Sequence, residues 1–117
     1  MSSLDNSVIG INAILKPKDA GREWRNFVEN LVLINKEKGY AFLYEIYELD
    51  GIVHLHQRFK DAVAYKKQFE FFSAEIAEEF YGFFEVQKIA VYGEVSKDIH
   101  KALAGINAKF FSTVARF

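Results

Sequence analysis

The sequence predicts a single α+β domain over residues 1–117, in which helices cover one face of an antiparallel sheet. Three observations support this fold class. A hairpin pattern surrounds Asp50-Gly51, two flanking stretches repeat apolar residues at helical spacing, and two outer stretches alternate as strands do. The resulting order, β-α-β-β-α-β, is the ferredoxin-like plan. In chain order we expect a strand at 8–16, a helix at 20–37, the hairpin at 41–59, a helix at 61–82, a strand at 84–95 and a C-terminal helix/strand extension at 96–117.

Composition narrows the possible functions. The net charge is −1, and 16% of the residues are aromatic, including twelve Phe. A domain of this size has a limited interior, so some rings are expected to line a pocket or a subunit interface. The basic residues are scattered, which gives no electrostatic reason to expect nucleic acid or an anionic membrane as a partner. The absence of cysteine from the sequence excludes disulfides and thiolate metal sites.

The N-terminal residues lack the basic and then apolar layout of a signal peptide. No apolar run in the sequence is long enough to cross a bilayer. We therefore expect a cytoplasmic protein with no membrane partner.

The strand at 8–16 is largely apolar on both sides, as is typical of a central strand covered on two faces. Asn12 is its polar exception, and it either makes a hydrogen bond within the fold or points at a ligand. Pro17 ends the strand. The helix that follows has Asp19 as its expected N-cap and Gly39 after its last turn. Its apolar stripe consists of Trp24, Phe27, Val28, Leu31 and Ile34.

The hairpin has two different faces. A two-residue turn at Asp50-Gly51 places Leu49 opposite Ile52 and thereby fixes which side chains share a face. One face is mostly apolar, and we expect helices to cover it. The other face is mixed, which suggests a partner or a ligand. The apolar face carries Phe42, Tyr44, Ile46, Leu55, Gln57 and Phe59, and the mixed face carries Leu43, Glu45, Tyr47, His54, His56 and Arg58.

The second helix is strongly amphipathic. Asp61 can cap it, a break is expected near 71–73, and Gly82 is expected to close it. Its aromatic stripe either forms core alone or also walls an apolar cavity. The stripe consists of Tyr65, Phe69, Phe72, Ile76, Phe80 and Phe83.

The C-terminal part supplies a strand and an extension. Strict alternation in 84–95 places Val86 and Lys88 on one face, opposite Gln87 and Ile89. Ser96 can cap a short helix that ends near Gly105. Residues 106–117 have strand composition, and they add an edge strand or reach another subunit.

A sheet with helices on one face leaves its other face to be buried. The mixed apolar character of that face favours a homodimer in which two sheets face each other.

A local pattern strengthens this expectation. Gly39 is followed by YEIYEL, a short turn and then HLHQRFKDAVAY. This pattern resembles the antibiotic biosynthesis monooxygenase-like family of dimeric α+β barrels. The resemblance implies a ferredoxin-like fold, a homodimer and, in some members, cofactor-independent oxygenation of aromatic polyketides or quinols.

The chain also departs from this family. Gln57 stands where the family often has Glu, Phe59 where it often has Trp, and Gln68 where a helical His is frequent. Haem-degrading members use an Asn, a Trp and a His, and only Asn12 falls where the first of these would lie. Haem degradation is therefore not expected.

His54, His56 and Glu45 could be read as a metal site, because they share one face of the hairpin. The interpretation we favour is structural: His54 stacks with Tyr47, and His56 pairs with Glu45 across the strands. No metal and no cofactor are expected.

The hypothesis that ranks first is a small-molecule binding protein. It would hold an elongated apolar ligand, such as a fatty-acyl chain or a polycyclic aromatic, between the sheet and the helices. The alternative is a cofactor-independent monooxygenase of an aromatic polyketide or quinol, and a purely structural role in assembly ranks third. No catalytic residue is assigned. The candidate ligand-binding residues are Asn12, Trp24, Tyr44, Leu55, Gln57, Phe59, Phe69 and Phe72.

Overall fold

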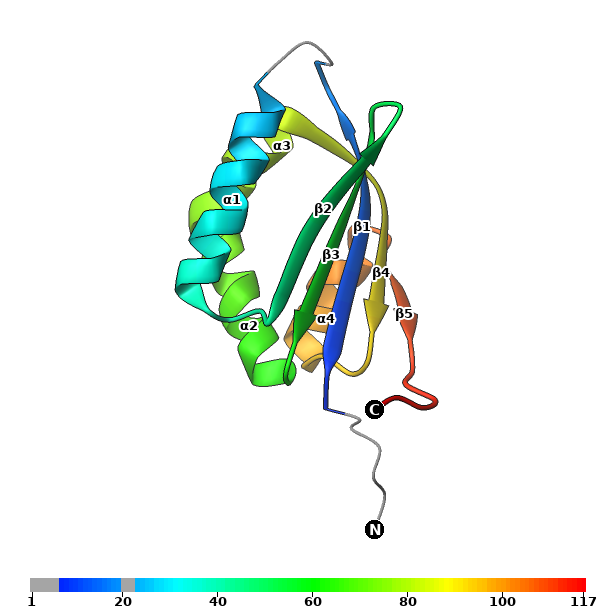
Figure 1. The fold of residues 1–117 in the computed structure, drawn as a ribbon. Helices are drawn as coiled ribbons and strands as arrows, with labels where there is room; N and C mark the ends of the chain where they lie inside the picture. Colours follow the sequence, from blue (N-terminus) through cyan, green and yellow to red (C-terminus); the bar gives the residue numbers. More distant parts are fainter. Residues whose placement is uncertain (1–6, 20–22) are drawn as a thin grey trace.

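The computed structural model describes residues 7–19 and 23–117. In this part of the chain a five-stranded sheet has the order β2-β3-β1-β4-β5, and helices cover one of its faces (Figure 1). β5 pairs with β4 in parallel, and the other pairs are antiparallel. This α+β arrangement is compatible with the ferredoxin-like plan. The elements are β1 (Ile9–Pro17), α1 (Trp24–Lys38), β2 (Leu43–Leu49), β3 (Ile52–Phe59), α2 (Ala62–Phe71), the π-helix η1 (Phe72–Ile76), α3 (Ala77–Phe83), β4 (Phe84–Tyr92), α4 (Lys97–Ala104) and β5 (Lys109–Phe111).

The hairpin of β2 and β3 has the predicted register. Tyr44 lies opposite Gln57, and the turn residues Asp50 and Gly51 have φ values of 51° and 80°. Positive φ at both positions is the geometry of the tight turn that matches the twist of paired strands. Phe42 was expected beside Phe59 on the covered face, but it precedes β2 and is 62% exposed.

β1 is the central strand, paired with β3 on one side and β4 on the other. Its partners in β4 shift between Ile14, opposite Lys88, and Leu15, opposite Val86. Gln87 is therefore an extra residue, as in a β-bulge. Strict alternation predicts that Val86 shares a face with Lys88; the bulge instead turns Val86 toward the helices.

The start of α1 differs from the prediction. The helix begins at Trp24, and Glu23 is its N-cap residue, without a side-chain capping bond. Asp19 is thus not the N-cap, and the expected first turn at 20–22 lies outside the described residues. The C-terminal end is as expected, because Gly39 has φ 71° and its N–H donates to the Asn35 carbonyl at 3.0 Å.

The second helical stretch is capped by Asp61, whose Oδ1 accepts from the Ala64 N–H at 2.8 Å. It is interrupted where a break was expected, but the interruption is the π-helix η1, and the chain continues into α3 without a gap. The last helical residue is Phe83, one beyond the expected Gly82. A π-turn accommodates an additional residue, so it alters which side chains face the sheet.

The core has two parts. One contains α1, η1 and α3 against one end of the sheet, with Leu31, Val53 and Phe84 at its centre. The other contains α2 and α4 against the opposite end, around Phe59 and Val91. Both clusters include residues of β1, so this strand joins them.

The C-terminal segment forms an edge strand within the same chain. The Gly93 N–H donates to the Phe111 carbonyl at 2.8 Å, and the rings of Tyr92 and Phe111 are 5.4 Å apart. Only Lys109–Phe111 is strand, so the strand composition of 106–117 overestimated its length.

Among the described residues, no helix combines the length and the apolar character that a membrane span requires.

Gly93 provides a test of how β4 meets its neighbours. Its φ is 96°, and a Cβ there would lie 2.7 Å from the Val8 carbonyl oxygen. We expect Gly93→Ala to lower the free energy of unfolding by more than about 1 kcal/mol, measured by urea denaturation.

The matched control is Gly82→Ala in α3. No described atom lies within 4 Å of a Cβ at this position. Removing a helical glycine should raise the free energy of unfolding by about 0.5–1 kcal/mol. A Gly93→Ala protein as stable as the wild type would contradict the described geometry.

Candidate functional site

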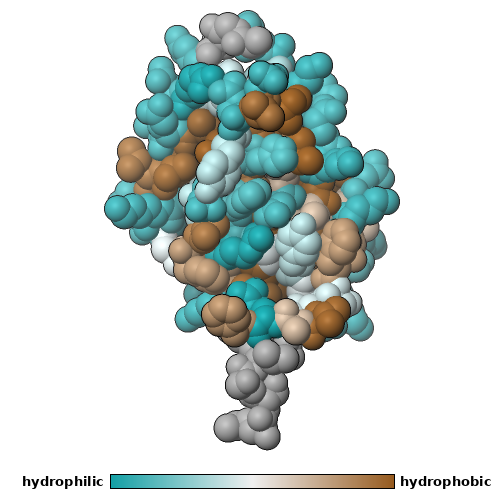
Figure 2. All heavy atoms as spheres, turned by 45° about the vertical axis from the view of Figure 1, so that its right-hand side comes forward, coloured by the Kyte–Doolittle hydropathy of each residue, from teal (hydrophilic) through white to brown (hydrophobic). Residues whose placement is uncertain are grey.

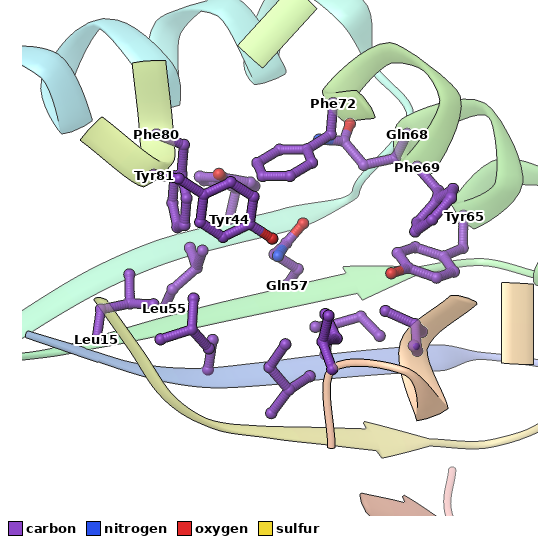
Figure 3. Close-up of a pocket in the computed structure, with 16 residues that line it drawn as sticks. Leu15, Tyr44, Leu55, Gln57, Tyr65, Gln68, Phe69, Phe72, Phe80 and Tyr81 are labelled. Atoms are coloured by element: carbon purple, nitrogen blue, oxygen red, sulfur yellow. The ribbon is translucent and has the colours of Figure 1, made fainter. Parts of the chain in front are cut away.

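A cavity of about 100 Å³ lies between the sheet and the helices (Figure 3). Its floor comes from all four antiparallel strands, β1 to β4, and its other walls come from α2, η1, α3 and the end of α4. Two of the lining residues, Tyr81 of α3 and Ile106 after α4, are themselves 41% and 47% exposed. The lining residues are Ile11, Ala13, Leu15, Tyr44, Leu55, Gln57, Tyr65, Gln68, Phe69, Phe72, Phe80, Tyr81, Val86, Ile89, Leu103 and Ile106.

Three aromatic rings from η1 and α3 form one wall. Phe72 meets Phe80 edge to face at 5.3 Å and Tyr81 at 6.1 Å, and Phe80 meets Tyr81 at 5.5 Å. Edge-to-face contacts at these distances are favourable between aromatic rings. The wall is therefore made of rings that support one another.

The β4 bulge shapes the floor on the other side. Because Gln87 is the extra residue, Val86 and Ile89 both border the cavity. In β1 the floor residue between Ile11 and Leu15 is Ala13, whose small side chain leaves space beneath the rings. Irregular backbone thus occurs on both sides of the cavity, in η1 and in β4.

The polar groups of the cavity are all uncharged. Among the described residues that line it, none is Asp, Glu, Lys, Arg or His. Figure 3 shows the Gln57 amide pointing from the sheet into the cavity. Gln68 is 4% exposed, and its Oε1 finds no hydrogen-bond partner among the described residues.

The tyrosines of the cavity stay protonated at neutral pH. Burial raises the pKa of the Tyr44 hydroxyl above its usual value. Burial, and to a smaller extent the nearby Tyr81, raises the pKa of Tyr65, and burial also raises the pKa of Tyr81. These hydroxyls can donate or accept hydrogen bonds, but they do not supply a negative charge.

The structure brings together five of the predicted ligand-binding residues, namely Tyr44, Leu55, Gln57, Phe69 and Phe72.

Two predicted residues belong to the core and do not line the cavity. Trp24 is buried against Phe84, with the ring centres 5.8 Å apart. Phe59 is fully buried and packs against Tyr65 at 4.9 Å, so it supports a cavity residue from behind.

Asn12 lies on the opposite face of the sheet. Its Oδ1 accepts from Arg58 Nη1 at 2.9 Å, and the same nitrogen donates to the Gln57 carbonyl at 2.7 Å. Of the two roles expected for Asn12, the structure shows the hydrogen bond within the fold, and Asn12 is not among the residues that line the cavity.

Sequence reasoning missed several lining residues, among them Gln68 and Tyr81. Gln68 had a usable signal, because it lies three residues after Tyr65 on the stripe that faces the sheet. A polar residue within such a stripe indicates a buried polar group. Tyr81 had no comparable signal, because the π-turn of η1 brings it toward the cavity.

The mixed hairpin face differs in detail from its prediction. The Tyr47 ring lies 5.6 Å from His56 and not against His54. Glu45 lies directly opposite His56 across the strands, and it also raises the pKa of the nearby Tyr47 hydroxyl. Among the described residues no three His, Asp or Glu side chains are placed to hold a metal ion.

The outer face of the sheet has a groove of about 630 Å³, lined mainly by β1, β3, β4 and β5. Figure 2 shows hydrophilic side chains interspersed with apolar patches on the side of the molecule that includes this face. Its lining residues include His54, His56, Lys88, Ala90 and Tyr92.

Comparison with known proteins identifies the fold. No protein-family model matches the chain, and no curated protein matches it. The crystal structure of MupZ from Pseudomonas fluorescens is similar, with a TM-score of 0.81 over 96% of this chain and 94% of that chain. The likeness shows a shared fold. The two sequences are 13% identical. The likeness therefore concerns the arrangement of helices and strands and not the residues of the cavity.

The raised pKa of Tyr44 gives a pH test of its burial. Unfolded Tyr44 loses its proton near pH 10, whereas the folded protein retains it. The unfolded state then binds fewer protons, so stability falls as the pH rises above that value. Between about pH 9 and pH 11, we expect the wild type to lose about 1 kcal/mol more than Tyr44→Phe does, measured by urea unfolding.

Equal losses in the two proteins would mean that Tyr44 ionises freely in the folded state. That result would contradict the placement of its hydroxyl in the cavity.

Proposed function

We propose that this protein binds a small apolar molecule in the cavity between the sheet and α2, η1 and α3. The observation that carries the proposal is a cavity lined by aromatic and aliphatic side chains with a few buried, uncharged polar groups. Sites for small molecules are typically apolar and contain a small number of placed hydrogen-bonding groups.

The volume limits what the cavity can enclose. Cavities of about 150 Å³ bind benzene, and sites for larger ligands usually measure about 300 Å³ or more. A cavity of about 100 Å³ is therefore suited to one small ring or the end of a chain. An elongated ligand would place its terminal group inside, and the remainder would leave past Tyr81 and Ile106.

An unfilled cavity is also costly. At about 24 cal/mol per Å³, an empty space of this size destabilises the fold by about 2 kcal/mol. A domain of this kind has only about 5–15 kcal/mol of stability in total. A ligand that fills the space would restore much of this lost stability. This favours a binding site over a mere packing defect.

The alternative function is cofactor-independent oxygenation of an aromatic polyketide or quinol. Such chemistry needs a group that removes a proton from the substrate. The described lining residues include no carboxylate, imidazole or amine, so we rank this function second. Oxygen uptake in the presence of quinols or anthrones distinguishes the two.

We further propose a homodimer that buries the outer face of the sheet. On this face Tyr47 is 53% exposed, and Ile14, Ala90 and Tyr92 are only partly buried in the single chain. Helices cover the other face, so this side of the sheet has the larger remaining area for a second copy (Figure 1).

Ala13→Leu tests the binding site directly. The larger side chain occupies space in the floor of the cavity, so toluene should bind at least about tenfold more weakly than to the wild type, measured by titration calorimetry. Native mass spectrometry of freshly purified wild type should also show a bound small molecule that Ala13→Leu lacks.

The matched control is Ala102→Leu, at an exposed position of α4. It should bind toluene as the wild type does. Equal binding by Ala13→Leu and Ala102→Leu would rule out the cavity as the site.

The dimer has its own test in Ala90→Glu, which introduces a charge at the centre of the outer face. In analytical ultracentrifugation, the wild type should sediment at twice the 13.5 kDa chain mass, and Ala90→Glu at the chain mass.

Leu33→Glu is the control on the helical side, where Leu33 is 63% exposed. It should remain dimeric. A wild type that is monomeric at micromolar concentration would refute the proposed dimer and leave the binding proposal intact.

A further inference from the structure

We propose that the guanidinium of Arg58 binds the carboxylate of a small organic acid, whose apolar part lies in the groove on the outer face of the sheet. This site is on the opposite side of the sheet from the cavity described above, so it is independent of the binding proposed there.

Arg58 is a partly buried charge without a counter-charge in the described part of the chain. Its side chain leaves β3 on the outer face, and no described carboxylate lies within 4.0 Å of its nitrogens. Charges that are removed from water are normally paired, because the lost hydration has to be replaced. An uncompensated guanidinium here favours an anion from outside the chain.

The fold holds this guanidinium in one orientation. Nη1 donates to Asn12 Oδ1 at 2.9 Å and to the Gln57 carbonyl at 2.7 Å, and Cζ lies 5.5 Å from the centre of the Tyr92 ring. Gly10 makes room for it, because a Cβ there would lie 3.0 Å from Cζ, Nε and Nη1 of Arg58. A donor group that is already fixed loses little freedom when a ligand binds.

Two donors of Arg58 remain available to a ligand. Nε and Nη2 make no hydrogen bond to a described residue. Unlike the enclosed side-chain oxygens of Asn35 and Gln68, they keep contact with solvent. Nε and Nη2 form one edge of the guanidinium, and a carboxylate accepts two parallel N–H bonds from such an edge.

The groove adjoins this guanidinium and has space for the rest of the ligand. Asn12 and Tyr92, which both contact Arg58, are among its lining residues. Its volume of about 630 Å³ is within the usual range for small-molecule sites. Its apolar lining comes from Ile14, Ala90, Tyr92 and Phe111.

The charges of the groove also favour an anion. Lys88 and Lys109 line it and are exposed, and no described lining residue is Asp or Glu. Glu45 and Glu85 belong to neighbouring positions, but neither lines the groove or forms an ion pair with Arg58. A groove with this balance of charge attracts anions and repels cations.

A second copy of the chain on this face would enclose the groove and would bring its own carboxylates to it. A carboxylate of the second copy would make the same contact with Arg58 as a ligand does. The experiment must therefore separate these two sources.

Cinnamate and cinnamamide test the site, because they share one apolar body and differ in charge. Their dissociation constants are measured at pH 7 by titration calorimetry. The wild type should bind cinnamate at least about tenfold more tightly than cinnamamide. Arg58→Gln should weaken cinnamate binding about 10- to 100-fold and change cinnamamide binding by less than about twofold.

Arg58→Lys is the second variant, for the case that Arg58→Gln does not fold. It keeps the positive charge but loses the paired donors, so cinnamate should bind about fivefold more weakly than to the wild type.

Arg25→Gln is the matched control, because Arg25 is exposed on α1 and pairs with Glu48 away from the groove. It should bind cinnamate as the wild type does. Saturating toluene should not displace cinnamate, because toluene is expected in the cavity on the other side of the sheet.

Three results would overturn the inference. The first is a wild type that does not bind cinnamate below about 1 mM, and the second is equal cinnamate binding by Arg58→Gln and the wild type. The third is a dimeric wild type that does not bind cinnamate and becomes monomeric in Arg58→Gln, because the carboxylate then comes from the second copy. None of these results alters toluene binding, so the proposed function fails or stands separately.

Discussion

The packing of the aromatic stripe of α2, η1 and α3 over β1 is the constraint on which the rest of the structure depends. β1 is paired on both sides and contributes to both core clusters, so the helical layer has to cover it along its length. The rings of Phe72 and Phe80 extend over the middle of the strand, where Ala13 is small. Large rings above a small residue leave a space that neither layer fills.

Two backbone irregularities adjust the layers around this space. The π-turn of η1 changes the direction of the side chains that follow it, which brings Tyr81 to the cavity. The bulge at Gln87 turns Val86 inward on the opposite side. π-turns and bulges both occur frequently beside functional sites, because each redirects side chains at a modest cost in hydrogen bonding. Their presence on both sides of one cavity is the physical case for a binding site.

The features that the sequence predicted well are those determined by local rules. The Asp50-Gly51 turn and the period of two determine the hairpin register, and the Asp61 cap needs only the residues beside it. The features it missed depend on several elements at once. The bulge at Gln87 arises from pairing with β1, and the face of Asn12 could not be read because both sides of that strand are apolar. Tyr44 and Gln57 were placed correctly by hairpin alternation, whereas the contribution of Tyr81 depends on a π-turn whose type local patterns do not specify.

The central claim is that an apolar space able to accept a ligand exists above Ala13. Diffraction from a xenon-pressurised crystal tests it most directly, because xenon occupies apolar cavities and scatters strongly. The account predicts a xenon site enclosed by Ala13, Phe72 and Phe80 and reached past Tyr81. A structure in which side chains fill this space and xenon is absent from it would contradict the account.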